Sequence, residues 1–392
     1  MKKFILALFS VFLFCSCEEE AFIPEEAFLQ IYDDQNYNVS YQPVALGNSD
    51  SSIFILSERN LDVSNFSGIN LLITDLAGNF KEEQILADQY VAPTKDLIKI
   101  GATHYFFCMD RSTLRPHLTT VSGSGALAFI PLNISNSYPL ATALDGGNNL
   151  ILLSYNQDDR TTVISTISTD GQIQNQAEYS IGAGNDVLEA ITDHFTRRNE
   201  RLPFFCGQAP NGSYYFNAFY NFTLSLVFTD LGEEPSGVVQ GQGSDAAMKY
   251  LLPVGGNNYA FIAYQFADHF LSGSTELPAN SVSSSVNYFN RKVPEIAPDT
   301  YSKIVDYTFS TDELSIMAAE TEGRQVILYF FDKVTGDLIN TYLLGTLNPF
   351  TFSDIKVFED GGIGIVGTTF LADRFERVYL QKISRSQIID IL

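Results

Sequence analysis

The sequence predicts an all-β protein, and three observations support this prediction. Short runs rich in Val, Ile, Phe, Tyr and Thr alternate apolar with polar side chains, as half-buried strands do. Gly, Asn and Asp bound these runs and supply the turns between them. Long helical periodicity is absent from the sequence. The only segment expected to be helical is 186–201, on the spacing of Ile191, His194 and Phe195.

A repeated unit organises most of the chain. In its clearest copy a strand at 353–357 is followed by the turn Asp360-Gly361-Gly362, a second strand, and a third strand at 377–383. The copies are expected at 44–86, 97–132, 140–173, 187–240, 248–266, 303–344 and 353–383. A period of this length is typical of repeat architectures in which each unit packs on the next.

The repeat predicts a β-propeller. A sheet with two apolar faces cannot bury both alone, and radial packing of several sheets buries them while protecting the edges. We therefore predict one domain over 27–392, with seven four-stranded antiparallel blades. Tandem β-sandwiches are the alternative, because alternating strands with frequent turns suit both folds. Ring closure needs an outer strand, which either 27–32 or 387–392 could supply.

The repeat also resembles those of exported bacterial β-propellers and β-propeller lipoproteins. The order is Asp-Gly-Gly, a strand, Gly-Thr-Thr, a variable loop and a final strand, and the segments 366–369 and 379–383 carry the resemblance best. The resemblance implies a scaffold and no particular reaction, since this fold hosts many functions.

The N-terminus predicts export and a lipid anchor. Lys2 and Lys3, then an apolar run over 4–14, have the order of a secretory signal peptide, which we place at 1–16. The apolar run is shorter than the roughly 20 residues that a membrane-spanning helix needs. The junction 14–17 resembles the lipobox of bacterial lipoproteins, and this resemblance implies that Cys17 is acylated and anchors the chain in the membrane.

An acidic segment follows the predicted anchor. Glu18, Glu19, Glu20, Glu25 and Glu26 lie within 17–26, which we interpret as a solvated tether. The run resembles the acidic export tag of surface lipoproteins from the Bacteroidota phylum. We therefore expect an outer-membrane location in the cell envelope, on its periplasmic or its external side.

The net charge limits the expected binding partners, and the positions of the cysteines limit the expected disulfides. The formal net charge of −23 becomes −25 without the two lysines at positions 2 and 3, and it repels nucleic-acid phosphates. Nucleic acid is therefore not expected as a partner. Apart from Cys15 and Cys17, the cysteines are Cys108 and Cys206. Both lie in strand-like runs of non-adjacent repeats, so two buried thiols are favoured over one disulfide.

Motifs for catalysis or metal binding are weak. The four histidines, His104, His117, His194 and His269, have no zinc-ligand spacing, and His104 and His269 are expected to border strands. The pairs 33–34 and 158–159 lack the rest of a calcium loop. We expect no catalytic residue, no metal site and no cofactor, although carboxylates converging in a propeller funnel could support glycosidase chemistry.

Two segments depart most from the repeat, and we expect them to be loop insertions that carry recognition. They are 267–302, within which 273–283 is expected to be dispensable for folding, and 195–212, which carries Arg197, Arg198 and Arg201. The aromatic residues of 214–222 suit a sugar or a partner protein, although half of them are expected in the core.

The predicted function follows from these points. We expect a monomeric, envelope-anchored propeller that binds or scaffolds a protein or an extracellular polymer through ligand-binding residues that the sequence leaves unknown. The alternative is a glycan-capturing or polysaccharide-processing surface protein. Converging carboxylates and aromatic platforms in the funnel would favour the alternative, and a flat face with many loops would favour the first hypothesis.

Overall fold

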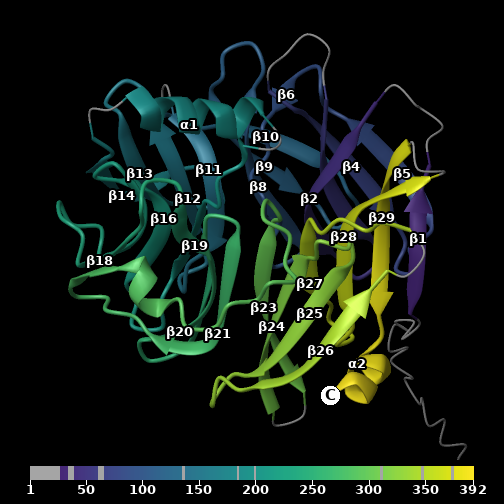
Figure 1. Cartoon of the computed structure of the whole chain (residues 1–392). Helices are drawn as coiled ribbons and strands as arrows, with labels where there is room; N and C mark the ends of the chain where they lie inside the picture. Colours follow the sequence, from purple (N-terminus) through teal and green to yellow (C-terminus); the bar gives the residue numbers. More distant parts are fainter. Residues whose placement is uncertain are drawn as a thin grey trace, which may run out of the picture.

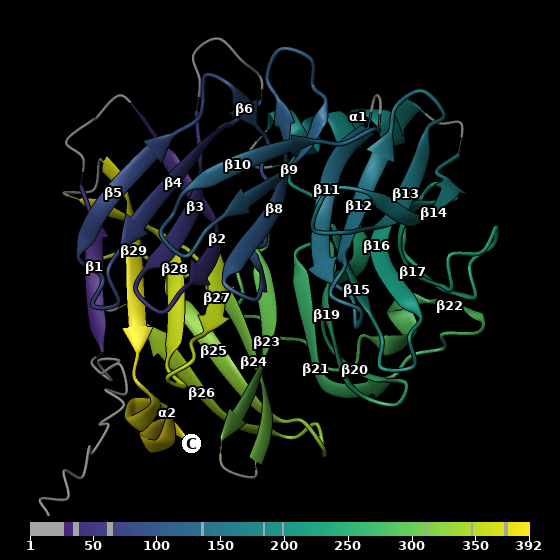
Figure 2. The same cartoon turned by 180° about the vertical axis from the view of Figure 1, so that it is seen from behind.

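The computed structural model describes residues 27–33, 39–60, 66–134, 137–182, 185–197, 200–309, 312–345, 348–371 and 375–392. The predicted signal peptide, Cys17 and the acidic tether lie outside these residues. Twisted antiparallel sheets follow one another in chain order around a ring, from purple through teal and green to yellow (Figure 1) and again when seen from behind (Figure 2). The protein is a β-propeller, as predicted, and the tandem-sandwich alternative is wrong.

The first sheet has nine strands and contains two of the predicted repeat units. The first unit consists of β2 (Tyr41–Asn48), β3 (Ile53–Arg59), β4 (Gly68–Thr74) and β5 (Phe80–Ile85). The second consists of β7 (Ile98–Ile100), β8 (Thr103–Asp110), β9 (Pro116–Val121) and β10 (Leu127–Pro131). The short strand β6 (Tyr90–Val91) pairs with both β4 and β8 and joins the units. Because one hydrogen-bonded sheet carries two units, the count of seven blades stays a prediction.

The remaining sheets each contain one unit. The next contains β11 (Ser137–Leu144), β12 (Leu150–Asn156), β13 (Thr161–Ile167) and β14 (Ile173–Ser180). It is followed by β15 (Phe205–Gln208), β16 (Tyr214–Tyr220), β17 (Thr223–Thr229) and β18 (Gly237–Gln240), then by β19 (Ala246–Gly255), β20 (Asn258–Gln265) and β21 (Asp268–Glu276). The last two contain β23 (Ser302–Phe309), β24 (Asp312–Glu320), β25 (Val326–Asp332) and β26 (Leu338–Leu344), then β27 (Asp354–Val357), β28 (Ile363–Leu371) and β29 (Phe375–Ile383).

Besides the nine-stranded sheet, two of the described sheets differ from the predicted four strands. In the described part of the chain the sheet of β19 to β21 has three, while β22 (Val282–Ser284) pairs in parallel with β18 and gives the preceding sheet a fifth. The connection is held there by Leu277 and Ala279, which are buried in the core shared with β16, β17 and β20. Gly237 permits this close approach, since a Cβ on it would lie 2.4 Å from the Ala279 backbone.

The ring is closed by the N-terminal strand. Strand β1 (Phe28–Tyr32) pairs antiparallel with β29, from Phe28 opposite Lys382 to Tyr32 opposite Val378. Of the two segments considered for closure, 27–32 is therefore the one used. The other cannot be a strand, because Ser384 and Gln387 form a capping box that begins α2 (Arg385–Ile391).

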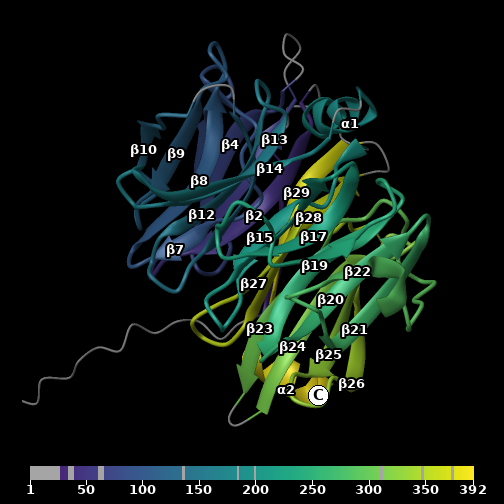
Figure 3. The ribbon, with the colours of Figure 1, turned by 90° about the vertical axis from the view of Figure 1, so that its left-hand side faces the viewer.

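The helix predicted at 186–201 is shorter than expected. It is α1 (Asn185–Thr196), and it packs Val187 and Ile191 into the core around β12 and β16. After the helix the chain turns back, where the Leu202 amide donates to His194 Nδ1 at 2.9 Å. A 3-10 turn, η2 (Ser285–Tyr288), lies in the connection before β23. Figure 3 shows α1 and α2 at opposite ends of the molecule.

The Asp-Gly turns are structural, as predicted. Asp145 Oδ1 accepts from the amides of Gly147 and Asn149 at 2.8 and 2.7 Å, and Asp360 Oδ1 accepts from Gly362 in the equivalent turn. Cys108 and Cys206 are free thiols, Cys108 buried and Cys206 partly buried, which confirms the expectation of two unpaired thiols. Among the described residues, no helix is long and apolar enough to cross a membrane.

Candidate functional site: a pocket where the first strands meet

The first strand of each unit lies nearest the axis of the ring. Each is an edge strand of its sheet, and β11 contacts β7 and β15, β19 contacts β15 and β23, and β27 contacts β23 and β2. Side chains on these strands, or on the segments that lead into them, therefore converge. A pocket of about 550 Å³ opens where they do so. Its wall includes Gln42 of β2, Lys95 before β7, Arg201 before β15, Lys249 of β19, Thr300 before β23 and Ser353 before β27.

A buried ion network crosses the axis beside the pocket. Lys303 Nζ on β23 contacts Asp96 at 2.6 Å and Asp354 of β27 at 2.7 Å, and Asp354 also accepts from the Leu46 amide of β2 at 2.7 Å. Burial alone would lower the pKa of Lys303, but the two carboxylates hold it well above its usual value. Breaking such a pair by removing one partner costs about 3–5 kcal/mol. The network therefore fixes the strands that frame the pocket.

Carboxylates gather around the pocket mouth. Glu200, Asp245 and Asp299 are exposed, whereas Glu320 at the end of β24 and Glu376 of β29 are half-buried. Burial raises the pKa of Glu320, so this carboxyl holds its proton more readily than an exposed one. The arrangement offers hydrogen-bond acceptors, and at Glu320 a group that can also donate.

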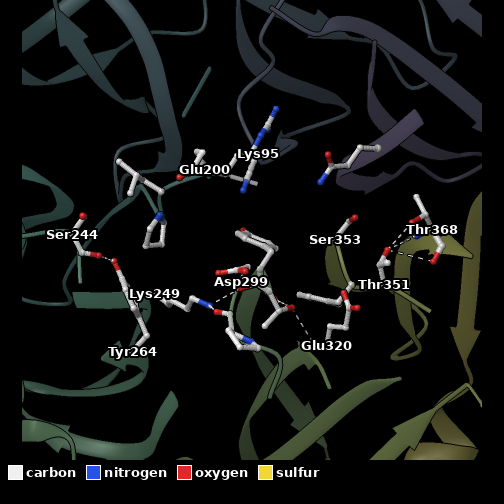
Figure 4. A pocket seen from close by; sticks show the side chains of 18 of the residues that line it. Lys95, Glu200, Ser244, Lys249, Tyr264, Asp299, Glu320, Thr351, Ser353 and Thr368 are labelled. Atoms are coloured by element: carbon white, nitrogen blue, oxygen red, sulfur yellow. Dashed lines mark hydrogen bonds between the residues drawn. The ribbon is translucent and has the colours of Figure 1, made fainter. Parts of the chain in front are cut away.

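Aromatic rings line the same space. Tyr264 lies at the end of β20 and Phe266 in the turn that follows it, and Phe266 is 70 % exposed. Tyr301 stacks on Phe352 with ring centroids 6.0 Å apart and planes at 12°. The Tyr264 hydroxyl donates to the Ser244 carbonyl at 2.6 Å, which fixes the ring at the pocket wall (Figure 4).

Lys249 holds one wall in place. Its ammonium donates to the carbonyls of Thr300 and Pro298 at 2.7 and 3.2 Å and lies 2.7 Å from His269 Nε2. Burial lowers the pKa of His269 to about 3, so its ring is neutral and accepts this proton. Burial likewise lowers the pKa of Lys249 to about 7. Because an ammonium has three donors, Lys249 has none left for a ligand.

Lys95 enters the pocket from a different side (Figure 4). Its Nζ lies 4.2 Å from the centroid of the Tyr301 ring. Burial, followed by the nearby Arg201 guanidinium, lowers the pKa of Lys95 to about 7. Arg201 in turn pairs through Nη2 with Glu58, which is 2 % exposed.

The predicted recognition segments reach the pocket only in part. Arg201 lines it, Arg197 pairs with Asp193 at the end of α1, and Arg198 lies outside the described residues. The segment 267–302 contributes only 298–301. The view of 273–283 as a dispensable exposed loop is wrong, because this stretch contains the end of β21, buried Leu277 and Ala279, and β22.

Other sequence predictions have simple outcomes. His104 and His269 are the second residues of β8 and β21, so they border strands as expected. The aromatic stretch 214–222 is mostly core, with Tyr215, Phe216 and Phe219 buried and Phe222 exposed away from the pocket. Among the described residues, no group of three or more His, Cys, Asp or Glu side chains could hold a metal ion.

Sequence reasoning missed Lys95, Lys249 and Lys303. A signal exists for Lys249, which interrupts the otherwise apolar start of β19, whereas the strand of Lys303 also contains Ser302 and Asp306 and gives no such signal. A charged residue at such a position is costly to bury unless it is paired. Lys95 lies in a connection beside Pro93, where the sequence shows no pattern of this kind.

Comparisons with known proteins identify a fold and no family. No family model matches this chain, and no curated protein does. A catalytically inactive virginiamycin B lyase from Staphylococcus aureus, solved with quinupristin, aligns with a TM-score of 0.52 and 12% identity, over 91% of this chain and 100% of that one. A streptogramin B lyase aligns with a TM-score of 0.50 and 12% identity, over 91% and 98%.

At this identity the likeness shows the fold alone, and it agrees with the sheets described above. The fold and the site together define a β-propeller with a polar pocket where its first strands converge.

Proposed function

We propose that this protein is a binding propeller whose pocket holds a hydroxyl-rich ligand, a segment of a glycan. One observation carries the proposal: carboxylates and aromatic rings from separate sheets converge on a single pocket. Converging carboxylates and aromatic platforms favour glycan capture over a flat scaffolding face.

The chemistry of the wall suits a saccharide. Carboxylates such as Asp299 and Glu320 accept hydrogen bonds from sugar hydroxyls, and the faces of Tyr264 and Phe266 offer apolar surface to sugar C–H groups. The volume of about 550 Å³ lies within the range of small-ligand sites, roughly 300–1,000 Å³. The pocket would therefore take a few sugar units and leave the rest of a polymer outside.

The binding test is a glycan array probed with wild type and two pocket variants, Tyr264→Ala and Glu320→Gln. Phe222→Ala is the matched control, because this aromatic side chain is 50 % exposed and lies away from the pocket. Both pocket variants should lose about five- to 150-fold in affinity for any captured glycan, since removal of one well-placed contact costs about 1–3 kcal/mol. Identical capture by all four proteins would contradict the proposal.

We also propose that the propeller is anchored in the cell envelope through Cys17, and the lipobox-like junction at 14–17 supports this. In a Triton X-114 partition the wild type should enter the detergent phase, because acyl chains bury many methylenes at about 0.8 kcal/mol each. Cys17→Ser should move to the aqueous phase and lose its acyl label, with Cys15→Ser as the matched control. A Cys17→Ser protein that keeps its label would overturn the anchor.

A further inference from the structure

Lys95 has a fixed position and an unused ammonium. The preceding residue is fixed to β8 by two hydrogen bonds, from the Thr94 amide to the Phe107 carbonyl at 2.8 Å and from the Phe107 amide to Thr94 Oγ1 at 3.0 Å. The following residue, Asp96, is fixed by Lys303. Within the described ranges Lys95 Nζ makes no hydrogen bond or ion pair, and its only specific contact is the Tyr301 ring.

The carboxylates around Lys95 pair with other cations. Glu58 pairs with Arg201, whereas Asp96 and Asp354 share Lys303. Arg201 also keeps its Nε buried and without a partner among the described residues. Two cations therefore face the pocket with donors to spare, and they repel one another.

An anionic group would satisfy both cations at once. Charge-assisted hydrogen bonds are roughly twice as strong as neutral ones, and a partly desolvated site strengthens them further. A ligand with several negative charges would bind poorly, because each further anionic group would meet an exposed carboxylate at the pocket mouth. These carboxylates are Glu200, Asp245 and Asp299. The pocket thus favours a single negative charge placed deep, with neutral hydroxyls outside it.

We infer that the ligand of this pocket is a saccharide with one anionic group, and that Lys95 and Arg201 bind that group. The inference rests on the proposed glycan-binding function and names the class of ligand for the same pocket. Carboxylate and sulfate share the required chemistry, so the experiment below includes both.

The test is titration calorimetry with three matched probes. They are a trisaccharide that carries one uronic acid, its methyl ester, and a trisaccharide of the same sugars that carries one sulfate. The proteins are wild type, Lys95→Gln, and Lys292→Gln, a control that removes an exposed lysine paired with Asp268. Thermal unfolding of each variant, and of Lys95→Met as a second substitution, confirms that the fold is intact.

Wild type and Lys292→Gln should bind the acid at least tenfold more tightly than the ester. Lys95→Gln and Lys95→Met should lose most of this preference for the acid, because only Arg201 then remains to bind the anionic group, and they should bind the ester as wild type does. Sulfate binding equal to that of the acid would assign the site to any singly charged group, and weaker binding would assign it to carboxylates.

Equal affinity of wild type for acid and ester would overturn the inference, and so would a preference for the acid that is undiminished in both Lys95 variants. If the ester still binds and Tyr264→Ala weakens it, the proposed glycan-binding function stands while the inference falls. If wild type binds none of the three probes the inference also falls, and the glycan array decides the proposed function separately.

Discussion

Lys95 and Lys249 show how two lysines of one pocket acquire different roles. Burial lowers the pKa of both to about 7. Lys249 places its ammonium on two carbonyls and a neutral histidine, so it fixes the wall. Lys95 has the Tyr301 ring beneath its ammonium and no hydrogen-bond acceptor among the described residues, so its donors remain for a ligand.

The affinity for an anionic ligand should depend on pH, because Lys95 titrates near neutral pH. The charged groups nearest Lys95 are Arg201, Glu58 and Asp96, and the Tyr301 ring lies beneath its ammonium. Lys249 and His194 also interact with it electrostatically. With a pKa of about 7, Lys95 is charged below this pH and neutral above it. Affinity for the uronic-acid probe should therefore fall as the pH rises from about 6 to 8.5, and affinity for the methyl ester should stay nearly constant.

Calorimetric titrations across this range measure the effect, with Lys95→Gln as the control that should remove the slope. A bound anion raises the pKa of Lys95, which moves the loss toward higher pH. An affinity for the acid that rises with pH would refute the role of Lys95.

His104 carries a second residue-scale prediction, on stability. Burial, with smaller effects from Lys356 and Lys99, lowers its pKa from 6.5 to about 4. The unfolded chain then binds a proton at a higher pH than the folded one. The neutral, buried His104 therefore contributes to the free energy of unfolding. This contribution is fully present above pH 6.5 and is lost as the pH falls toward 4. Between pH 6.5 and 4.5 the loss should be about 2 kcal/mol, at 1.36 kcal/mol per pH unit.

Urea unfolding of wild type and His104→Leu at several pH values isolates this effect, because all other titrating groups are shared. The variant should be less sensitive to acid by about that amount, whatever its stability at pH 7. Parallel stability curves for the two proteins would show that His104 takes up no additional proton on unfolding.

At the scale of single elements, the connection after β21 is the clearest departure from the repeat. Its Ser-rich composition looks like an exposed loop, yet it carries Leu277, which is fully buried, and ends in β22 on the neighbouring sheet. The serine content of a segment indicates only how polar that segment is, and not which residues distant in sequence it contacts. A strand that pairs with another sheet depends on contacts distant in sequence, which composition does not record.

Leu277→Ala should therefore destabilise the fold by about 2–5 kcal/mol, since it leaves a cavity in the core. Val282→Ala is the matched control from the same connection. Its side chain is 73 % exposed, and its loss should change stability by less than about 0.5 kcal/mol. Denaturant midpoints measure both. Equal and small effects would mean that the connection is a dispensable loop after all.

The two helices illustrate how far local signals reach. The start of α2 is determined by neighbouring residues, because Ser384 and Gln387 form its capping box. The end of α1 at Thr196 depends on the chain that returns to His194, a contact that helical periodicity does not record, so the sequence predicts an end at 201 instead. Strand boundaries near Asp-Gly turns were easier to place, because Asp145 and Asp360 bind the amides of their own turns.

For the whole molecule, the sequence predicted the β-propeller and the order of its repeats, since both depend on periodicity and turn residues. It did not predict the pocket. The pocket forms from residues as distant as Gln42 and Thr368, which only ring closure brings together. For ring closure the sequence leaves two candidate segments, 27–32 and 387–392. The structure uses the first, because β1 pairs with β29.

We propose that a saccharide binds in the pocket where the first strands of the units converge. The most direct measurement is a crystal structure of the protein soaked with the tightest-binding saccharide from the array. We expect the ligand in the pocket, with its anionic group at Lys95 and a sugar face on Tyr264 or Phe266. A ligand bound at the opposite end of the ring, beside the turns of Asp145 and Asp360, with no saccharide in the pocket, would contradict it.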